Sequence, residues 1–200
     1  MSHDIIVPLG VPHSDRYRGV CDGGIDDEDW SEFTEVRRYT NAFIIQDGKI
    51  LLGYKKRGYG QGLWNGFGGK VEPGESSLQA AERELEEEAG IRAQLRLAGT
   101  LFFIDAKVPW AFHIDIFVAH TFTGEIIETD EMRPQWFCAQ MAEDTEDPEV
   151  ARLPQIPYDR MWADDIYWMP QLLRDTPFAG RMDFAKNGTL RKWWVAKVVN

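Results

Sequence analysis

Residues 69–91 read GKVEPGESSLQAAERELEEEAGI, and this stretch decides which fold the rest of the chain is expected to adopt. Its second half predicts a helix over residues 76–89. Ser76 or Ser77 can cap the first turn through its hydroxyl, and Gly90 can end the last turn in a left-handed conformation. The first half is rich in Gly and Pro, so the chain is expected to pass from a loop into the helix.

One face of the predicted helix carries three carboxylates. Glu84, Glu87 and Glu88 are separated by three and four residues, which places them within about 100° of one another. Carboxylates this close repel each other, and Mg²⁺, which favours carboxylate and water oxygens, would remove the conflict. For the helix alone, a solvated acidic surface is the usual alternative. The apolar stripe expected to pack into a core consists of Leu78, Ala81 and Leu85.

The glycines before the helix predict a loop that lies close to a ligand. Gly68, Gly69 and Gly74 can take positive φ angles, and without a Cβ they let the backbone approach a bound group. A main-chain carbonyl of this loop is a further candidate oxygen for a metal ion. Glu75 and Arg83 are expected to form a charge pair that joins the loop to the helix, so Arg83 need not contact substrate.

Apolar alternation and turn signals predict the other elements. Asp47-Gly48 has the composition of a two-residue hairpin turn. In chain order, the signals predict a hairpin over 38–45 and 49–54, a short strand and turn over 64–71, an antiparallel strand pair over 95–104 and 111–122, a strand over 135–137, a helix from Asp164 or Asp165 toward Arg174, and a closing hairpin over 178–198.

Two segments fall outside this pattern. Residues 1–35 contain prolines, glycines and the acidic run 26–29, and we expect a poorly ordered or loosely docked arm. A solvated tail and an interaction arm are both open as its role. Residues 139–155 are acidic and contain proline, so we expect an inserted loop within one domain over residues 36–200.

The composition limits the partners. The 200-residue chain is 44% hydrophobic, enough for a core, and its formal net charge is -11. This charge repels phosphate backbones, so no nucleic acid partner is expected, whereas a small phosphorylated ligand is compatible with it when a metal ion is bound. Cys21 and Cys138 are expected to be free thiols. No apolar run is long enough to span a membrane and no secretory signal is recognisable, so we expect no membrane partner and a cytoplasmic location, with the nucleus and the mitochondrion as alternatives.

The spacing within residues 69–91 resembles the signature of the Nudix hydrolase family at every fixed position: Gly, five residues, Glu, seven residues, Arg-Glu-aliphatic-x-Glu-Glu-x-Gly-aliphatic. The resemblance implies an α+β fold, an α/β/α sandwich with a central mixed sheet. It also implies a hydrolysis that depends on Mg²⁺, with Mn²⁺ as a substitute. By position, the metal ligands would be Gly68 through its carbonyl, Glu84, Glu87 and Glu88, with Glu131 as a further acid. Glu87, Glu88 and Glu131 are the catalytic candidates, and the general base is left open between Glu88 and Glu131.

Further segments resemble the Nudix enzymes that hydrolyse oxidised purine nucleoside triphosphates. They are residues 55–60, 64–71, 130–134 and 161–168, within a resemblance from Tyr39 to Val198. In those enzymes one Asn and two adjacent Asp read a base that lies between aromatic side chains. The substrate-binding residues implied here are Asn65, Asp164, Asp165 and Trp162, with Tyr59, Phe103 and Phe112 in the pocket wall and Thr40 and Lys55 at its margin. This chain has Tyr59, Phe112 and Asn41 where Phe, Met and an aliphatic residue are usual, so the preferred base is left open.

The two adjacent carboxyls also have a physical role of their own. In an apolar pocket Asp164 and Asp165 should not both ionise, so they are expected to share a proton and to act as one donor and one acceptor. The structural alternative is that one of them caps the helix that follows.

The sequence therefore predicts a monomeric Mg²⁺-dependent hydrolase that cleaves 8-oxo-dGTP and 2-hydroxy-dATP to a monophosphate and pyrophosphate, which sanitises the nucleotide pool. Methylated purine triphosphates and other nucleoside diphosphate-linked compounds are alternative substrates. A domain that binds nucleotides without turnover is a rival, although such domains usually lose a signature glutamate and this chain has them all. An acidic protein-interaction module would rest on residues 1–35 alone.

Overall fold

The computed structural model describes residues 5–25, 29–139 and 147–199. The chain forms two compact units. The first unit comprises residues 1–38, 98–115 and 163–200, and the second comprises residues 39–97 and 116–162. None of the helices within the described ranges is long and apolar enough to cross a membrane.

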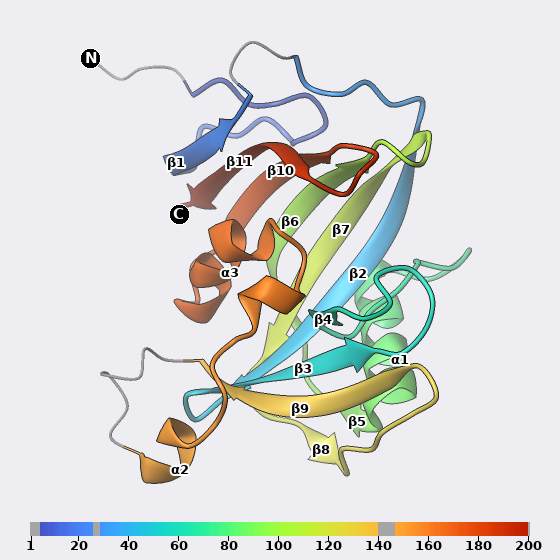
Figure 1. The fold of residues 1–200 in the computed structure, drawn as a ribbon, viewed down its shortest axis with the longest axis vertical. Helices are drawn as coiled ribbons and strands as arrows, with labels where there is room; N and C mark the ends of the chain where they lie inside the picture. Colours follow the sequence, from blue (N-terminus) through green and yellow to red (C-terminus); the bar gives the residue numbers. More distant parts are fainter. Residues whose placement is uncertain (1–4, 26–28, 140–146, 200) are drawn as a thin grey trace. The chain divides into compact units, whose positions relative to one another are not determined.

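The second unit contains the predicted hairpin (Figure 1). β2 (Glu35–Gln46) and β3 (Lys49–Lys55) are antiparallel, and Asp47 and Gly48 join them with φ angles of 49° and 73°. Two positive φ angles in succession suit a tight two-residue turn, as the Asp-Gly pair predicts. Two more strands pair with β3, namely β4 (Trp64–Asn65) and β9 (Met132–Cys138).

Helix α1 (Ser77–Ala89) has the ends that the sequence predicts. The Ser76 hydroxyl accepts the Gln79 N–H at 3.2 Å, and the Gln79 side chain accepts the Ser76 N–H at 2.8 Å. This reciprocal capping box satisfies two amides that a helix start would otherwise leave unpaired. Gly90 ends the helix with a φ of 74°, in the left-handed conformation that glycine tolerates best.

The buried face of α1 differs from the prediction at one residue. Ala81 and Leu85 are fully buried, but Leu78 is 38% exposed. Leu78 lies on the same side of the helix as Leu85 but in the first turn. Among the described residues, Ala81 is the first residue of α1 that belongs to the hydrophobic core. That core consists of Ala42, Ile44, Leu51, Phe67, Ala81, Leu85, Ala89, Ile91, Leu95, Phe117, Ala119 and Met132.

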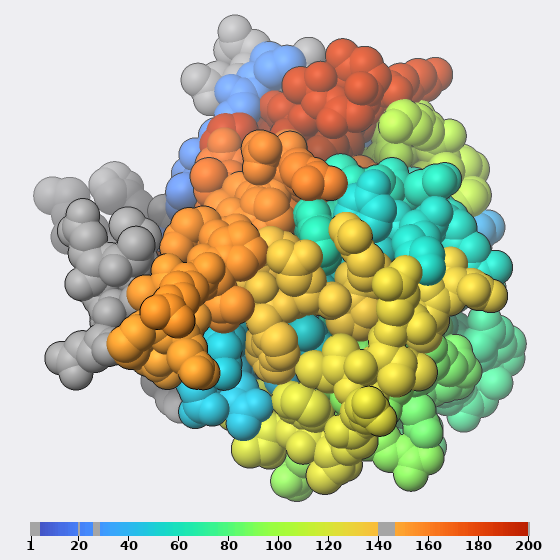
Figure 2. Space-filling model, turned by 60° about the horizontal axis from the view of Figure 1, so that its bottom comes forward, coloured from blue at the N-terminus to red at the C-terminus, as the bar shows by residue number. Residues whose placement is uncertain are grey.

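Shorter elements complete the second unit. They are β5 (Ile91–Arg92) and β8 (Thr123–Gly124), which pair with each other, α2 (Pro148–Ala151) and the 3-10 helix η1 (Tyr158–Arg160). The loop of residues 120–130 is exposed along most of its length and forms the yellow surface at the bottom of Figure 2. Of the predicted inserted loop, residues 140–146 lie outside the described residues, whereas the remainder contains α2 and a parallel bridge between Cys138 and Gln155.

The first unit is built on a mixed set of strands, in keeping with the predicted α+β class (Figure 1). Their order is β1 (Tyr17–Gly24), β11 (Leu190–Val198), β10 (Phe178–Phe184), β6 (Arg96–Asp105) and β7 (Trp110–Ala119). β10 is parallel to β6 and antiparallel to β11, and the closing hairpin is therefore confirmed. Helix α3 (Asp165–Leu173) packs on β10 and β11.

The N-terminal segment, for which a poorly ordered or loosely docked arm is expected, contains the strand β1. Its β1 pairs antiparallel with β11, and Tyr17 is buried with its ring edge against Trp194. The fully buried Arg181 guanidinium donates to the Ser31 carbonyl at 2.6 Å and to the Leu9 carbonyl. The glycine- and aspartate-containing strand has little β propensity of its own, so it is stabilised by the partner strand and by a buried cation that the local sequence does not reveal.

Candidate active site

The loop before α1 is fixed against β2 by backbone hydrogen bonds. The Thr40 N–H donates to the Gly69 carbonyl at 2.9 Å, and Ala42 and Phe67 exchange two bonds at 2.7 and 2.9 Å. A Cβ on Gly68 would collide with the Thr40 carbonyl. The close approach of two backbones therefore requires glycine at this point of the loop.

The glycines of this loop do not all act as predicted. Only Gly74 among the three has a positive φ, of 91°, so the positive φ expected at Gly68 and Gly69 is wrong. These two glycines are needed for space, because a Cβ on Gly69 would collide with the Glu84 carboxylate. The loop thus lies directly against the acidic face of α1.

Arg83 holds the acidic face together from within α1. It donates to Glu75 at 2.7 Å, which confirms the predicted charge pair between loop and helix. The same guanidinium donates to Glu84 at 2.8 Å and to Glu87 at 3.2 Å. A fourth partner is the Lys70 carbonyl, which accepts from Arg83 at 3.3 Å. Arg83 therefore joins the loop to the helix face through three carboxylates.

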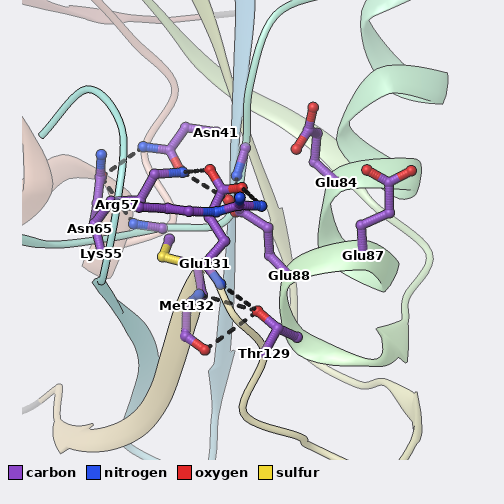
Figure 3. A network of polar contacts seen from close by, with 12 residues as sticks. Asn41, Lys55, Arg57, Asn65, Glu84, Glu87, Glu88, Thr129, Glu131 and Met132 are labelled. Atoms are coloured by element: carbon purple, nitrogen blue, oxygen red, sulfur yellow. Dashed lines mark hydrogen bonds and ion pairs between the residues drawn. The ribbon is translucent and has the colours of Figure 1, made fainter. Parts of the chain in front are cut away.

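Lys55 connects the other two candidate carboxylates (Figure 3). Its ammonium lies 2.8 Å from Glu88 and 2.6 Å from Glu131. The second Glu88 oxygen accepts the Gly68 N–H at 2.9 Å, and Arg57 approaches Glu131 at 3.2 Å. The fold thus brings together β3, the loop after residue 128 and the helix face, and it places the sequence-distant Glu131 beside Glu88.

Burial and charge act differently on these carboxyls. Burial raises the pKa of Glu88, against the opposing effects of Lys55 and the Gly68 N–H, and burial likewise raises the pKa of Glu84. The hydrogen bond from Lys55 lowers the pKa of Glu131, which is far more exposed. Two carboxyls that share one lysine therefore differ because one side chain is 5% exposed and the other 35%.

The donor set fits a hard divalent cation in its chemistry. Glu84 and Glu88 are desolvated carboxylates, and such oxygens are the ligands that Mg²⁺ prefers. Within the described ranges, however, no three acidic, His or Cys side chains converge on a common metal position. Lys55 pairs with Glu88 and Glu131 (Figure 3). Arg83 pairs with Glu84 and Glu87, so cationic side chains supply the countercharge in this arrangement.

A pair of carboxamides lies in the same unit. The Asn41 amino group donates to the Asn65 oxygen at 2.7 Å, and the same oxygen accepts the Gly66 N–H at 2.8 Å. Asn65 therefore presents its own amino group away from these two donors. The sequence predicts Asn65 as a base-reading residue, whereas Asn41 enters only as a departure from the usual aliphatic residue that leaves the preferred base open. The sequence does not reveal the antiparallel bridge between Ala42 and Phe67, and this bridge places Asn41 beside Asn65.

The remaining predicted residues of the second unit are aromatic or polar. Tyr59 stacks on Trp162, with ring centroids 5.3 Å apart and an interplanar angle of 25°. Tyr59 is 52% exposed, so the stack has a solvent-accessible side. Thr40 is buried, and its hydroxyl has no hydrogen-bond partner in the described part of the chain.

The other four predicted substrate residues belong to the first unit. Asp164 and Asp165 are both buried, and Asp164 accepts the Trp168 indole N–H at 3.1 Å. Asp164 stands at the N-cap position of α3 but makes no side-chain capping bond, and burial raises its pKa to about 7. Phe103 and Phe112 are buried and meet edge to face at 5.7 Å.

The fold and the acidic helix-and-loop site define a Nudix hydrolase. A family model of the NUDIX domain matches residues 36–172, and the chain belongs to this family, whose members generally need divalent metal ions. Among its relatives, the oxidized purine nucleoside triphosphate hydrolase of Danio rerio is 42% identical over 72% of this chain and 85% of that protein. The Mus musculus protein of the same name is 39% identical over 81% of this chain and 96% of its own.

Solved structures agree with this assignment. The MutT protein from Bacillus halodurans superposes with a TM-score of 0.63 at 26% sequence identity, and the match covers 80% of this chain and 97% of that one. The predicted family and α+β fold are therefore confirmed.

Proposed function

We propose that this enzyme hydrolyses oxidised purine nucleoside triphosphates, such as 8-oxo-dGTP and 2-hydroxy-dATP, to the monophosphate and pyrophosphate. The observation that carries the proposal is the oriented Asn65 carboxamide in the same unit as the Glu88–Lys55–Glu131 cluster (Figure 3). A base-reading amide and a phosphate-cleaving acidic site are the two functions such a hydrolase needs. The names of the two animal relatives support the same substrate class.

The acidic cluster would carry the phosphate chemistry. Glu84, Glu87 and Glu88, with the Gly68 carbonyl, would hold Mg²⁺, for which Mn²⁺ could substitute. When bound, the ion would neutralise phosphate charge and lower the pKa of a nearby water. Either Glu88 or Glu131 accepts the proton of the attacking water, and Lys55 keeps both carboxylates in place. The Arg83 pairs keep the helix face and the loop in register.

The base would be recognised by polar and aromatic groups. The Asn65 amino group can donate to a base acceptor, because both of its neighbours Asn41 and Gly66 donate to the oxygen of the same amide. The Trp162 ring offers a stacking surface beside Tyr59. We propose the same task for the Asp164 and Asp165 carboxyls, of which Asp164 can carry a proton near neutral pH. Thr40, Phe103 and Phe112 are proposed as further base contacts.

Pyrophosphate release with and without Mg²⁺ tests the proposal. The panel contains 8-oxo-dGTP, 2-hydroxy-dATP, N6-methyl-dATP, O6-methyl-dGTP and the four normal dNTPs. A kcat/KM for the oxidised purines well above that for normal dNTPs supports the proposed function. Preference for the methylated purines, or no turnover of any triphosphate, overturns it and assigns the site to another substrate.

Asn65→Ala should lower kcat/KM for 8-oxo-dGTP by about 10- to 100-fold, because a buried hydrogen bond to substrate is worth about 1–3 kcal/mol. The Mg²⁺ concentration for half-maximal activity should stay unchanged, since the Asn65 oxygen accepts from Asn41 and Gly66 and these bonds do not involve the carboxylates of the cluster. Asn187→Ala, in the exposed turn between β10 and β11, is the matched control. A shift in Mg²⁺ dependence with an unchanged substrate preference would contradict the base-reading role.

A further inference from the structure

Asn41 is a buried polar side chain whose oxygen is left unsatisfied. It is 9% exposed, and Asn41 Oδ1 has no hydrogen-bond partner among the described residues. Its amino group is engaged by Asn65. A buried acceptor without a donor costs about 1–3 kcal/mol of stability, so an orphan of this kind calls for an explanation.

The orientation of the two amides follows from the backbone. The Gly66 N–H can act only as a donor, so the Asn65 atom facing it at 2.8 Å must be the oxygen. Asn41 approaches that same oxygen at 2.7 Å and must therefore present its amino group. Both the Gly66 N–H and the Asn41 amino group therefore donate to the Asn65 oxygen. This leaves Asn41 Oδ1 as a fixed acceptor and Asn65 Nδ2 as a donor.

We propose that Asn41 is a specificity-determining residue, which fixes the Asn65 amide and whose own Oδ1 accepts an N–H from the base. This inference rests on the proposed function. Oxidation at C8 or C2 of a purine creates a carbonyl beside a ring N–H, where the parent base has only a nitrogen lone pair. Asn41 Oδ1 can accept a hydrogen bond from that N–H but repels the lone pair of the parent base. Asn41 therefore favours binding of oxidised purines over the parent purines.

Space around Asn41 supports a fixed position. A Cβ on Gly66 would collide with Asn41 Oδ1 and come close to the Phe43 ring, so the oxygen is confined between strand and loop. Asn65 keeps the Gly66 N–H if Asn41 is lost. Removal of Asn41 therefore leaves no new unpaired group behind, and its effect on substrate choice can be separated from its effect on stability.

Asn41→Leu is the test, since leucine has a similar shape and no polar atom. We expect kcat/KM for 8-oxo-dGTP to fall at least tenfold, kcat/KM for dGTP to stay or rise, and Tm to stay or rise because an unsatisfied acceptor is removed. In the Asn65→Ala background the effect of Asn41→Leu should shrink, because part of it acts through Asn65. Gln171→Leu is the matched control, since it removes another buried amide oxygen, on α3, that has no hydrogen-bond partner within the described ranges.

The outcomes separate the two levels of inference. A wild-type enzyme without preference for oxidised purines defeats the proposed function. If the wild-type enzyme is selective and Asn41→Leu keeps the same ratio of 8-oxo-dGTP to dGTP activity, only the proposed role of Asn41 is wrong. If Asn41→Leu fails to fold, Asn41→Ala, which adds no volume beside Gly66, gives the ratio instead, and an unchanged ratio there again overturns the inference.

Discussion

Glu88→Gln is expected to lower kcat by about 10³-fold while the fold survives. Glu88 lies where α1, the loop and Lys55 meet, and it is a candidate both for holding the metal ion and for accepting a proton. Glutamine has the same shape but carries no charge and is a much weaker base, and loss of a positioned general base costs about 10²–10⁴ in rate. The amide oxygen can still accept the Gly68 N–H. Pyrophosphate release at saturating substrate measures the loss, and circular dichroism with Tm shows that the fold is retained.

Glu86→Gln is the matched control for this experiment. Glu86 belongs to the same helix and loses the same charge, but its side chain is 47% exposed and pairs with Arg92. Its kcat should remain within about twofold of the wild-type value, because surface ion pairs contribute little. Equal effects of the two substitutions would mean that overall charge, and not the position of Glu88, governs turnover.

Asp164→Asn is expected to stabilise the protein in a pH-dependent way. Burial raises the pKa of Asp164 from 3.8 to about 7. Between these two values the folded state holds a proton that the unfolded state has lost, so the wild-type stability falls as pH rises and levels off above the folded pKa. Asparagine cannot ionise and can still accept the Trp168 N–H. The variant should therefore gain about 2–3 kcal/mol over the wild type between pH 5 and pH 8.

Thermal unfolding of both proteins across this pH range measures the gain. The Tm of Asp164→Asn minus the Tm of the wild type should be larger at pH 8 than at pH 5 by about 5–10 °C. Asp159→Asn, on the exposed surface of η1, is the control for the loss of one carboxylate. A stability difference between Asp164→Asn and the wild type that does not change with pH would show that Asp164 ionises normally in the folded protein.

Local chemistry determined the parts of this structure that the sequence predicts well. Three features depend on neighbours no more than eight positions apart, and each is present as predicted: the turn at Asp47 and Gly48, the capped α1 and the Glu75–Arg83 pair. The family and fold also follow from the local signature in residues 69–91, because its spacing is fixed by one loop and one helix.

Other features depended on which backbones the fold brings together. Gly68 and Gly69 are needed because the loop packs closely against β2 and Glu84. The presence of glycine alone predicts positive φ angles and does not reveal this packing. The N-terminal β1 has little strand propensity and exists because β11 offers an edge.

The site divides in the same way. The sequence by itself determined the acidic helix face, since period and spacing place Glu84, Glu87 and Glu88 together. Only the tertiary structure decided that Lys55 joins Glu88 to Glu131 and that Asn41 holds Asn65. Those contacts connect residues 24 to 76 positions apart, and the hydrogen bonds that form them depend on strand register, which no local pattern encodes.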